Sequence, residues 1–468
     1  MGIKKYLKGK NATLRLQSDP IGNMRRIHTP MRNRVFGMAR SRTAQVLSGL
    51  YLVALFLWTL PSQARGLEQL IASALATHPS TQGQRALVQS AESVVDSARW
   101  QFYPTPSVSV ETANASTTDR LYLGDNRVSI ARLQQPVWTG GRLTAGMDKA
   151  AAGLVASQAS LEEVRLQLGL RVVQAYGDWL SAHLKIIANE KSLATHLRLR
   201  EQIKRRLSEG ASAESDLTLA VTRLELISAD VTAARAQTEV SLARLGQMLG
   251  SPVDGALLAQ AVAAPRELAN AGRTGVQGQL EMALAINPTV AKAQAQARVQ
   301  EAVIGERRAD LMPEVYARIE RQYGNYSFPN GATENRLFIG LSSRFGAGLS
   351  SLSNIEAART QHAAALTEIE VQSRTVSEQV LSDYALAVSI VSRLASIQAS
   401  LKAAADVSTS YDRQFLAGRK SWLDVMNAAR ELAQTENQLA ELQSTQVVVT
   451  WRLAAYSRGI DAVSDVTK

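Results

Sequence analysis

The feature that most constrains the fold is a repeat, because the same landmarks occur twice along the chain at nearly constant spacing. The segment Ala74–Pro79 recurs as Ala283–Pro288, with the two prolines 209 residues apart. Three further pairs keep a separation of 208 or 209 residues: Pro104 and Pro313, Gly210 and Gly418, and Asp216 and Asp424. Four landmarks at one offset indicate two copies of a unit of roughly two hundred residues.

Each copy begins with two helices and continues with strands. Short helices are predicted at Leu67–Thr77 and Leu280–Ile286, and each precedes a helix that starts at a proline, where a missing N–H costs nothing. Apolar and polar residues then alternate, as in a sheet with one face of each kind. The predicted strands are Ser107–Thr112, Arg127–Leu133, Val315–Glu320 and Arg336–Leu341.

Long helices follow the strands in both copies. Apolar residues from Leu161 to Ile186 are spaced by three or four, which is typical of a coiled-coil seam. At about 1.5 Å per residue, Gly140 to Gly210 would extend roughly 105 Å and Ser351 to Gly418 roughly 100 Å. Helices of this length cannot fold into a compact globule, so we expect them to lie side by side in a cylinder or rod.

The net charge of +11 lies almost entirely at the N-terminus. Residues 1–45 contain eleven Lys or Arg and one acidic residue, Asp19, so the remainder carries 11 − 10 = +1. A nearly neutral body offers no broad basic face for phosphates, which argues against nucleic acid as a partner. The chain also has no cysteine, which excludes disulfides, thiolate metal sites and a lipid-modified cysteine.

The basic stretch precedes an apolar run, Val46–Leu60, which is shorter than the roughly twenty residues of a membrane-spanning helix. Small residues at Ser62 and Ala64 fit a signal-peptidase site. We therefore predict a signal peptide at residues 1–64, with an uncleaved anchor as the alternative. The remaining predicted units are a first repeat at 65–250, a linker at 251–279, a second repeat at 280–459 and a tail at 460–468.

Four strands are too few to close a membrane barrel, for which eight is the usual minimum. An open sheet edge in lipid would leave backbone groups without partners, at several kcal/mol each. Three chains would supply twelve strands. The expected fold is therefore mostly α with a small β part, in which a homotrimer shares an outer-membrane barrel above a tube of helical hairpins.

Three segments give the chain a resemblance to TolC-type outer-membrane channel proteins. They are Gln135–Arg142 at the first strand-to-helix junction, Arg206–Leu217 at the first hairpin and Gln414–Ala428 at the second. The resemblance covers Leu67 to Gly459 and departs from the family at Arg344–Gly348, which lacks the usual proline. It implies a trimer with a twelve-stranded barrel, a periplasmic tunnel of twelve helices, and closure at the periplasmic tip.

The resemblance also assigns candidate site residues. Asp424 and Asn427 match acidic positions that face the pore constriction, where a ring of carboxylates would favour cations. Lys420, Phe415, Ser215 and Asp216 match a latch between neighbouring hairpins, in which Lys420 would replace a bidentate arginine by a point charge. Hairpin turns that would contact the adaptor are assigned to Gly210, Gly418 and Arg419.

A simpler interpretation of the same residues is helix capping. Gly210 and Gly418 are ordinary helix stops, and Ser421 with Asp424 has capping-box spacing. The five histidines show no metal-binding spacing and are interpreted as helix-surface residues. No nucleotide, dinucleotide or nucleophile motif occurs, so we expect no cofactor, no metal site and no enzymatic activity.

Two transport functions share the expected fold. The first is the exit duct of a type I secretion system, which would export a large adhesin or toxin with an inner-membrane ABC transporter and a periplasmic adaptor. The alternative is the outer-membrane channel of a multidrug or metal efflux pump, with a proton-driven pump as partner. The absence of cysteine and the tip segment Arg419–Val425 favour secretion. A periplasmic coiled-coil protein without a pore is a third hypothesis, which leaves the strands unexplained.

Overall fold

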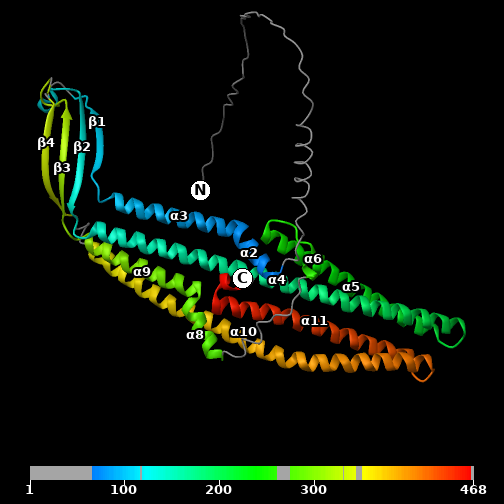
Figure 1. The fold of residues 1–468 in the computed structure, drawn as a ribbon. Coiled ribbons are helices and arrows are strands. Elements are labelled where there is room, and N and C mark those ends of the chain that lie inside the picture. The colour runs from blue at the N-terminus through cyan, green and yellow to red at the C-terminus, as the bar shows by residue number, and fades with distance from the viewer. Residues whose placement is uncertain are drawn as a thin grey trace, which may run out of the picture. The chain divides into compact units, whose positions relative to one another are not determined.

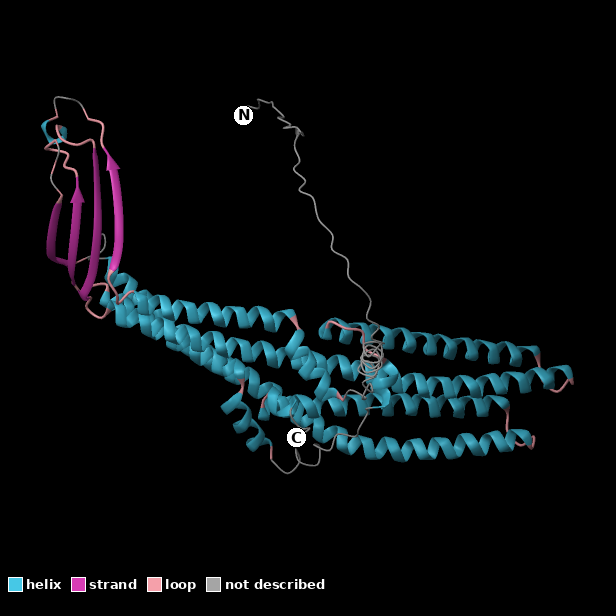
Figure 2. Cartoon of the chain, turned by 45° about the horizontal axis from the view of Figure 1, so that its top comes forward, coloured by secondary structure: helices cyan, strands magenta, loops and turns pink. Residues whose placement is uncertain are grey.

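The computed structural model describes residues 66–115, 119–260, 275–329, 331, 333–343 and 350–464. The predicted signal peptide, the Arg344–Gly348 segment, residues 261–274 of the predicted linker and residues 465–468 of the predicted tail lie outside these ranges. The described part consists of helices and one sheet, and the sheet lies beyond one end of the long helices (Figures 1 and 2).

The elements follow one another in the same order in both halves of the chain. The first half contains α2 (Leu67–Thr77), α3 (Pro79–Trp100), β1 (Thr105–Thr112), the 3-10 helix η1 (Arg120–Tyr122), β2 (Arg127–Trp138), α4 (Arg142–Ser208), α5 (Glu214–Leu249) and α6 (Gly255–Gln260). The second half contains α8 (Val276–Ile286), α9 (Pro288–Ala309), β3 (Glu314–Tyr323), β4 (Glu334–Ser342), α10 (Ser350–Leu416), α11 (Trp422–Arg458) and α12 (Ile460–Ser464).

The two proline-initiated helices are capped in equivalent ways. The ring of His78 accepts a hydrogen bond from the Ser80 N–H at 3.1 Å, and the side chain of Asn287 accepts one from the Thr289 N–H at 2.9 Å. Helix α8 begins at Val276 rather than at the predicted Leu280. The polar residues of its first turn concealed this start, because they interrupt the apolar pattern.

The four strands form one antiparallel sheet in the order β1-β2-β3-β4. Its central pair joins the two halves of the chain, with Leu133 opposite Ile319. Strand β2 extends past the predicted Leu133 to Trp138 and includes Pro136, next to a shift in register. A proline cannot donate to a ladder, so it is tolerated at such an irregularity but hides the strand from a pattern-based prediction.

The helices pack as a row that is four helices wide. Helix α4 contacts α3 and α5 on one side and α9 and α11 on the other, and α9 and α11 in turn contact α10. In Figure 1 the shorter helices α3 and α9 lie toward the sheet, and α5 and α11 lie toward the hairpin turns. The expected side-by-side packing of long helices is therefore observed.

A large apolar cluster forms where the short helices meet the long ones. Fully buried Ile71 of α2 and Trp179 of α4 pack there with Leu245 of α5. Ile460 of α12 belongs to the same cluster, so the start of the predicted tail is a packed helix. This helix was easy to miss because it is only five residues long and follows Gly459, the residue that caps α11.

Candidate functional site

The two faces of the sheet have opposite chemical character. On one face large apolar side chains are exposed, with Val108 at 76%, Leu337 at 71% and Ile339 at 80%. The other face contains Arg132, Arg318 and Glu320, and Glu320 is buried. Successive residues of a strand point to opposite faces, so this is the predicted alternation. An exposed apolar face of this kind is unusual for a sheet in water and indicates contact with another apolar medium or surface.

The buried carboxylate of Glu320 is held by two arginines on the polar face. Its Oε1 lies 2.6 Å from Nε of Arg132 on the neighbouring strand and 3.0 Å from Nε of Arg318. The Arg318 guanidinium also stacks over the ring of Phe338, 4.6 Å from its centroid. A buried charge is tolerated when it is paired in this way. The guanidinium groups remain partly exposed, so they present the polar face to water.

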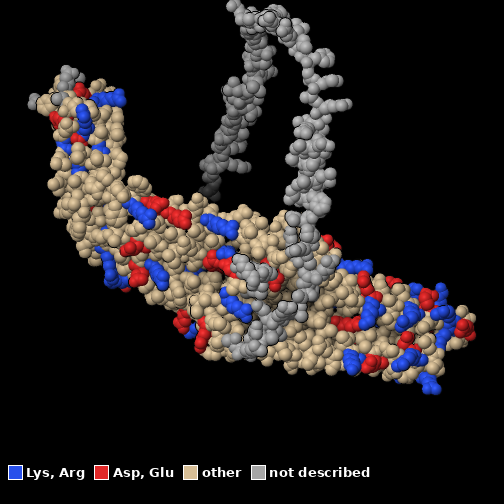
Figure 3. Space-filling view, in the orientation of Figure 1, with Lys and Arg blue, Asp and Glu red and all other residues tan. Residues whose placement is uncertain are grey.

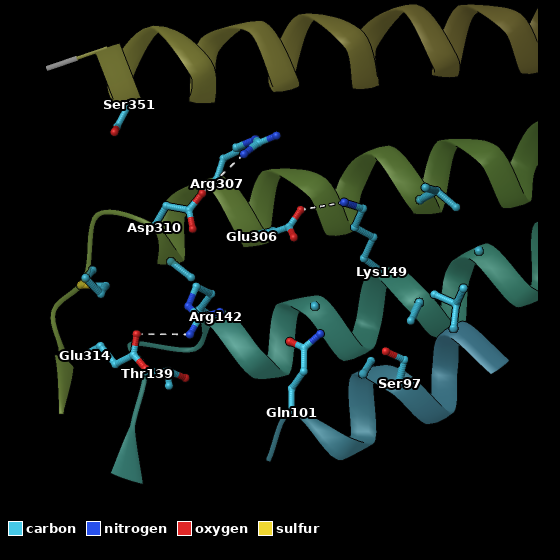
Figure 4. A pocket seen from close by; sticks show the side chains of 18 of the residues that line it. Ser97, Gln101, Thr139, Arg142, Lys149, Glu306, Arg307, Asp310, Glu314 and Ser351 are labelled. Carbon is cyan, nitrogen blue, oxygen red and sulfur yellow. Dashed lines mark hydrogen bonds and ion pairs between the residues drawn. The ribbon is translucent and has the colours of Figure 1, made fainter. Parts of the chain in front are cut away.

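A cavity of about 1160 Å³ lies where the strands meet the helices. Its walls come from α3, α4 and α9 and from the ends of the strands, including Gln134 and Glu314 of the polar face. Figure 4 shows the side chains that point into it. Three ion pairs occur there: Arg142–Glu314 at 3.2 Å, Lys149–Glu306 at 2.9 Å and Arg307–Asp310 at 3.5 Å. The polar face of the sheet thus continues into a charged, water-accessible surface of the helices.

The far ends of the long helices form two hairpin turns with the same backbone geometry. Gly210 follows the end of α4 with a φ of +73°, and Gly418 follows the end of α10 with a φ of +71°. The Ala211 N–H donates to Arg206 O at 2.8 Å, and the Arg419 N–H donates to Gln414 O at 2.8 Å. This is the Schellman arrangement, in which a glycine in the left-handed region satisfies the last carbonyls of a helix.

The return helices are capped by the two aspartates that the repeat singled out. Asp424 accepts hydrogen bonds from the Ser421 N–H at 3.3 Å and from the Ser421 hydroxyl at 2.8 Å, while the Asp424 N–H donates to that hydroxyl. Hydrogen bonding to Ser421 holds the pKa of Asp424 below its usual range. Asp216 accepts from the Ala213 N–H at 3.2 Å. The capping interpretation therefore describes both residues within one chain.

The residues assigned to the latch come from both hairpin turns. Lys420 Nζ lies 3.9 Å from Asp424 Oδ2 and 4.3 Å from the ring centroid of Tyr411. Ser215 and Asp216 begin the other return helix, and among the described residues no hydrogen bond or ion pair joins them to Lys420. Phe415 is buried inside the chain. Asn427, Gly210, Gly418 and Arg419 are exposed.

Sequence reasoning missed Arg206, although it opens the first hairpin segment. Its guanidinium carbon lies 4.3 Å from the centroid of the Phe415 ring, and Nη2 donates to Phe415 O at 3.3 Å. The contact joins α4 to α10, and the two contacting residues are 209 positions apart in the chain. A basic residue in the last turn of a helix is common, so no local pattern distinguished this one.

The prediction that all histidines lie on helix surfaces is wrong for His196. This residue of α4 is 1% exposed, and its Nδ1–H donates to the carbonyl oxygen of Ser192 at 2.9 Å. Burial lowers the pKa of His196, and the positive charge of Arg223 on α5 acts in the same direction. A neutral imidazole can fill a polar gap between helices, which the apolar spacing of the seam does not reveal.

Charged side chains of both signs are intermixed over the helices near the hairpin turns, whereas much of the sheet surface visible in Figure 3 has none. Among the described residues, no cluster of three or more His, Asp or Glu could hold a metal ion. The arrangement is therefore an apolar-faced sheet joined to a charged helical layer.

Comparison with known proteins agrees with this arrangement. Residues 70–251 and 279–457 match the family described as outer membrane efflux protein. The chain belongs to this family. It is accordingly an outer-membrane channel protein, as the resemblance implied, and channels of the family are transport proteins that work as homotrimers with periplasmic adaptors and inner-membrane pumps.

Several solved structures of outer-membrane proteins are similar to the family member described here. VceC from Vibrio cholerae is 15% identical, with a TM-score of 0.71 over 84% of this chain and 96% of that one. The outer membrane channel CmeC from Campylobacter jejuni is 14% identical, with a TM-score of 0.70 over 85% and 89%. The MtrE channel of Neisseria gonorrhoeae, in an open state, is 16% identical, with a TM-score of 0.66 over 86% and 93%. A search of curated proteins finds no match in sequence. These similarities confirm the expected fold.

Proposed function

We propose that three copies of this chain form an exit duct whose twelve-stranded barrel spans the outer membrane. The observation that supports this most directly is the four-stranded sheet with its apolar face exposed. Strands β1 and β4 are its two edges, and in lipid each edge needs a partner strand. Pairing β4 of one copy with β1 of the next would satisfy both edges and direct the apolar face to lipid.

The helices supply a second argument for association between copies. Helix α10 exposes large aliphatic side chains along its length, among them Leu366 at 51%, Val388 at 55% and Val391 at 54%. It contains an 18-residue stretch with a mean hydropathy of 1.4, which by length and composition alone could cross a membrane. Because α10 is an outermost helix of the row, we assign this surface to the neighbouring copy, so that the helices close into a tunnel.

The polar face of the sheet and the charged cavity would then line the pore. At the tip, Asp424 and Asn427 are proposed to surround the constriction, with one charge from each chain at the Asp424 position. A carboxylate whose pKa lies below the usual range stays ionised at neutral pH, which suits a cation-favouring ring. Lys420, Phe415, Ser215 and Asp216 remain the proposed latch residues. The exposed turns at Gly210, Gly418 and Arg419 are the proposed contacts of the periplasmic adaptor.

For the cargo, we propose protein export by a type I system with an inner-membrane ABC transporter, on the grounds of the tip segment and the lack of cysteine. Small-molecule efflux with a proton-driven pump is the second candidate, which the description of the matching family favours. Both need an open pore, so pore formation is tested first. Purified protein in planar bilayers should give conductance steps, and outer-membrane extracts should contain a heat-sensitive trimer.

A deletion strain separates the two cargoes. Loss of one large protein from the medium or cell surface, with unchanged drug sensitivity, would support protein export. An unchanged secreted profile with heightened sensitivity to small toxic compounds would support efflux and refute the secretion proposal. A soluble periplasmic rod without conductance would refute the duct itself.

A further inference from the structure

The apolar face of the sheet changes character toward its outer end, the end that lies away from the helices (Figure 2). On β3 the members of this face are every second residue, namely Val315, Ala317, Ile319, Arg321 and Tyr323. On β2 the same face contains Ser129, which is opposite Tyr323, and then Arg127, two residues further out. Two arginines therefore occupy the outer rows of a face whose other strand residues are uncharged.

Both arginines lie next to one tyrosine ring. The guanidinium carbon of Arg321 is 5.2 Å from the centroid of the Tyr323 ring, within the range of a cation–π contact, so its side chain extends toward the outer end. Arg127 is the diagonal neighbour of Tyr323, because Ser129 is the residue directly opposite. Diagonal neighbours are roughly 7 Å apart at the backbone, which is within reach of long side chains. The two arginines thus flank Tyr323, and all three residues are exposed.

These two charges differ from the arginines on the polar face in having no carboxylate. On the polar face Arg132 and Arg318 contact Glu320, and Arg336 contacts Glu334. Within the described part of the chain, neither Arg127 nor Arg321 forms an ion pair, and the strand residues on their face include no Asp or Glu. Their arrangement is complementary to an anion that comes from outside the chain.

The two arginines also lie at the height expected of a membrane boundary. Strand β2 has twelve residues, from Arg127 to Trp138, and Trp138 is 50% exposed at the end near the helices. At about 3.3 Å per residue and a tilt of about 40°, this strand spans roughly 28 Å of height. The apolar band of an outer-membrane barrel is roughly 25 Å tall. Arg127 and Trp138 therefore fall at opposite boundaries, and the long side chain of Arg321 reaches toward the outer one.

We propose that Arg127 and Arg321 bind the phosphate of a phosphorylated lipid in the outer leaflet of the membrane. The site rests on the proposed function, because it requires this face of the sheet to meet lipid. Guanidinium groups match phosphate oxygens in geometry and charge, and Tyr323 holds one of them in place. The acyl chains would lie on the apolar side chains below, such as Ile319 and Leu337. This continuity with the apolar face favours a lipid over a free anion.

The test is native mass spectrometry of the purified trimer with lipid A that carries both phosphates. The wild type should bind one molecule per chain, and bind it more tightly than phosphatidylethanolamine, whose headgroup has no net charge. Arg127→Gln and Arg321→Gln should each weaken binding of lipid A roughly fivefold, the factor for one basic residue at an anionic surface. The double variant should weaken it roughly 25-fold.

Two variants serve as controls. Arg336→Gln removes the same charge from the polar face near the same end of the sheet, and should change lipid A binding by less than about twofold. Arg127→Lys combined with Arg321→Lys should keep much of the binding, because an ammonium also binds phosphate.

Several outcomes would overturn the lipid site. They are an equal loss of lipid A binding in Arg336→Gln, equal binding of phosphatidylethanolamine, or displacement of lipid A by millimolar inorganic phosphate, which has no acyl chains. A double glutamine variant that still forms conducting trimers and binds lipid A as the wild type does would refute this site alone. A wild type that forms neither trimers nor channels would refute the duct, and the lipid site with it.

Discussion

The apolar face of the sheet allows a sharp test with two adjacent residues of β1. Val108 is 76% exposed on the apolar face, and its neighbour Ser109 is also exposed but points to the opposite face. If both faces met water, replacing either residue by lysine would have little effect. If the Val108 face contacts lipid, Val108→Lys places a charge in hydrocarbon while Ser109→Lys places it in the pore.

The expected magnitude follows from depth and exposure. A lysine on the lipid face of a barrel costs about 2–4 kcal/mol near the bilayer centre. Losing the contact of the valine side chain with lipid costs about 1–2 kcal/mol more. This is roughly three quarters of the free energy of burying a whole valine side chain, because Val108 is 76% exposed on this face. Val108→Lys should therefore lower the free energy of unfolding by about 3–6 kcal/mol per chain. Ser109→Lys should change it by less than about 0.5 kcal/mol, as surface substitutions usually do.

The assay is urea unfolding of protein reconstituted in lipid bilayers, followed by tryptophan fluorescence, together with the yield of trimer on unheated gels. Both variants carry the same new charge in the same strand, so a difference between them reports the medium on each face. Equal loss of stability in both variants, or none in Val108→Lys, would refute the assignment of this face to lipid.

Three further predictions concern the helices. Asp424→Ala should reduce cation preference and weaken block by multivalent cations in single-channel recordings, and unchanged selectivity would remove Asp424 from the gate. Because burial lowers the pKa of His196, the unfolded chain takes up a proton first as pH falls below about 6.5, so stability is lost between that pH and the folded pKa. His196→Gln should make Tm fall less between pH 7.5 and pH 5 than it does in the wild type. An unchanged fall in Tm would contradict the assignment of this pH dependence to His196. Gly418→Ala should lower the free energy of unfolding by about 1–2 kcal/mol in chemical denaturation, because its φ of +71° is unfavourable for alanine even though a Cβ would meet nothing within 4 Å. The control Gly153→Ala, inside α4, should instead raise the free energy of unfolding by about 0.5–1 kcal/mol.

The repeat made most of the fold predictable, because its landmarks are set by local backbone chemistry. Pro79 and Pro288 start helices, and Gly210 and Gly418 end them, whatever the surroundings are. Strand alternation likewise depends only on having one apolar and one polar face. The errors occurred where context outweighed pattern, as at Pro136, which lies inside β2 at a register shift.

The site was less predictable than the fold, because its contacts join distant segments. Asp424 could be placed at a helix start from its spacing to Ser421, and the capping geometry is as that spacing suggested. Phe415 and Arg206 meet only through the packing of α4 against α10, which no local pattern specifies. The same holds for His196, whose burial depends on which side of α4 the return helix covers.

The pairing of β2 with β3 has a consequence for the order of biogenesis. Leu133 meets Ile319 only after the helical hairpin between them has been synthesised, so this ladder is a contact of very long sequence separation. Such contacts form slowly, and here the product exposes apolar side chains that water disfavours. The helices can fold in the aqueous compartment first. We therefore expect the sheet to form last, with lipid and the neighbouring chains completing it together, so that membrane insertion and oligomer assembly become a single late step.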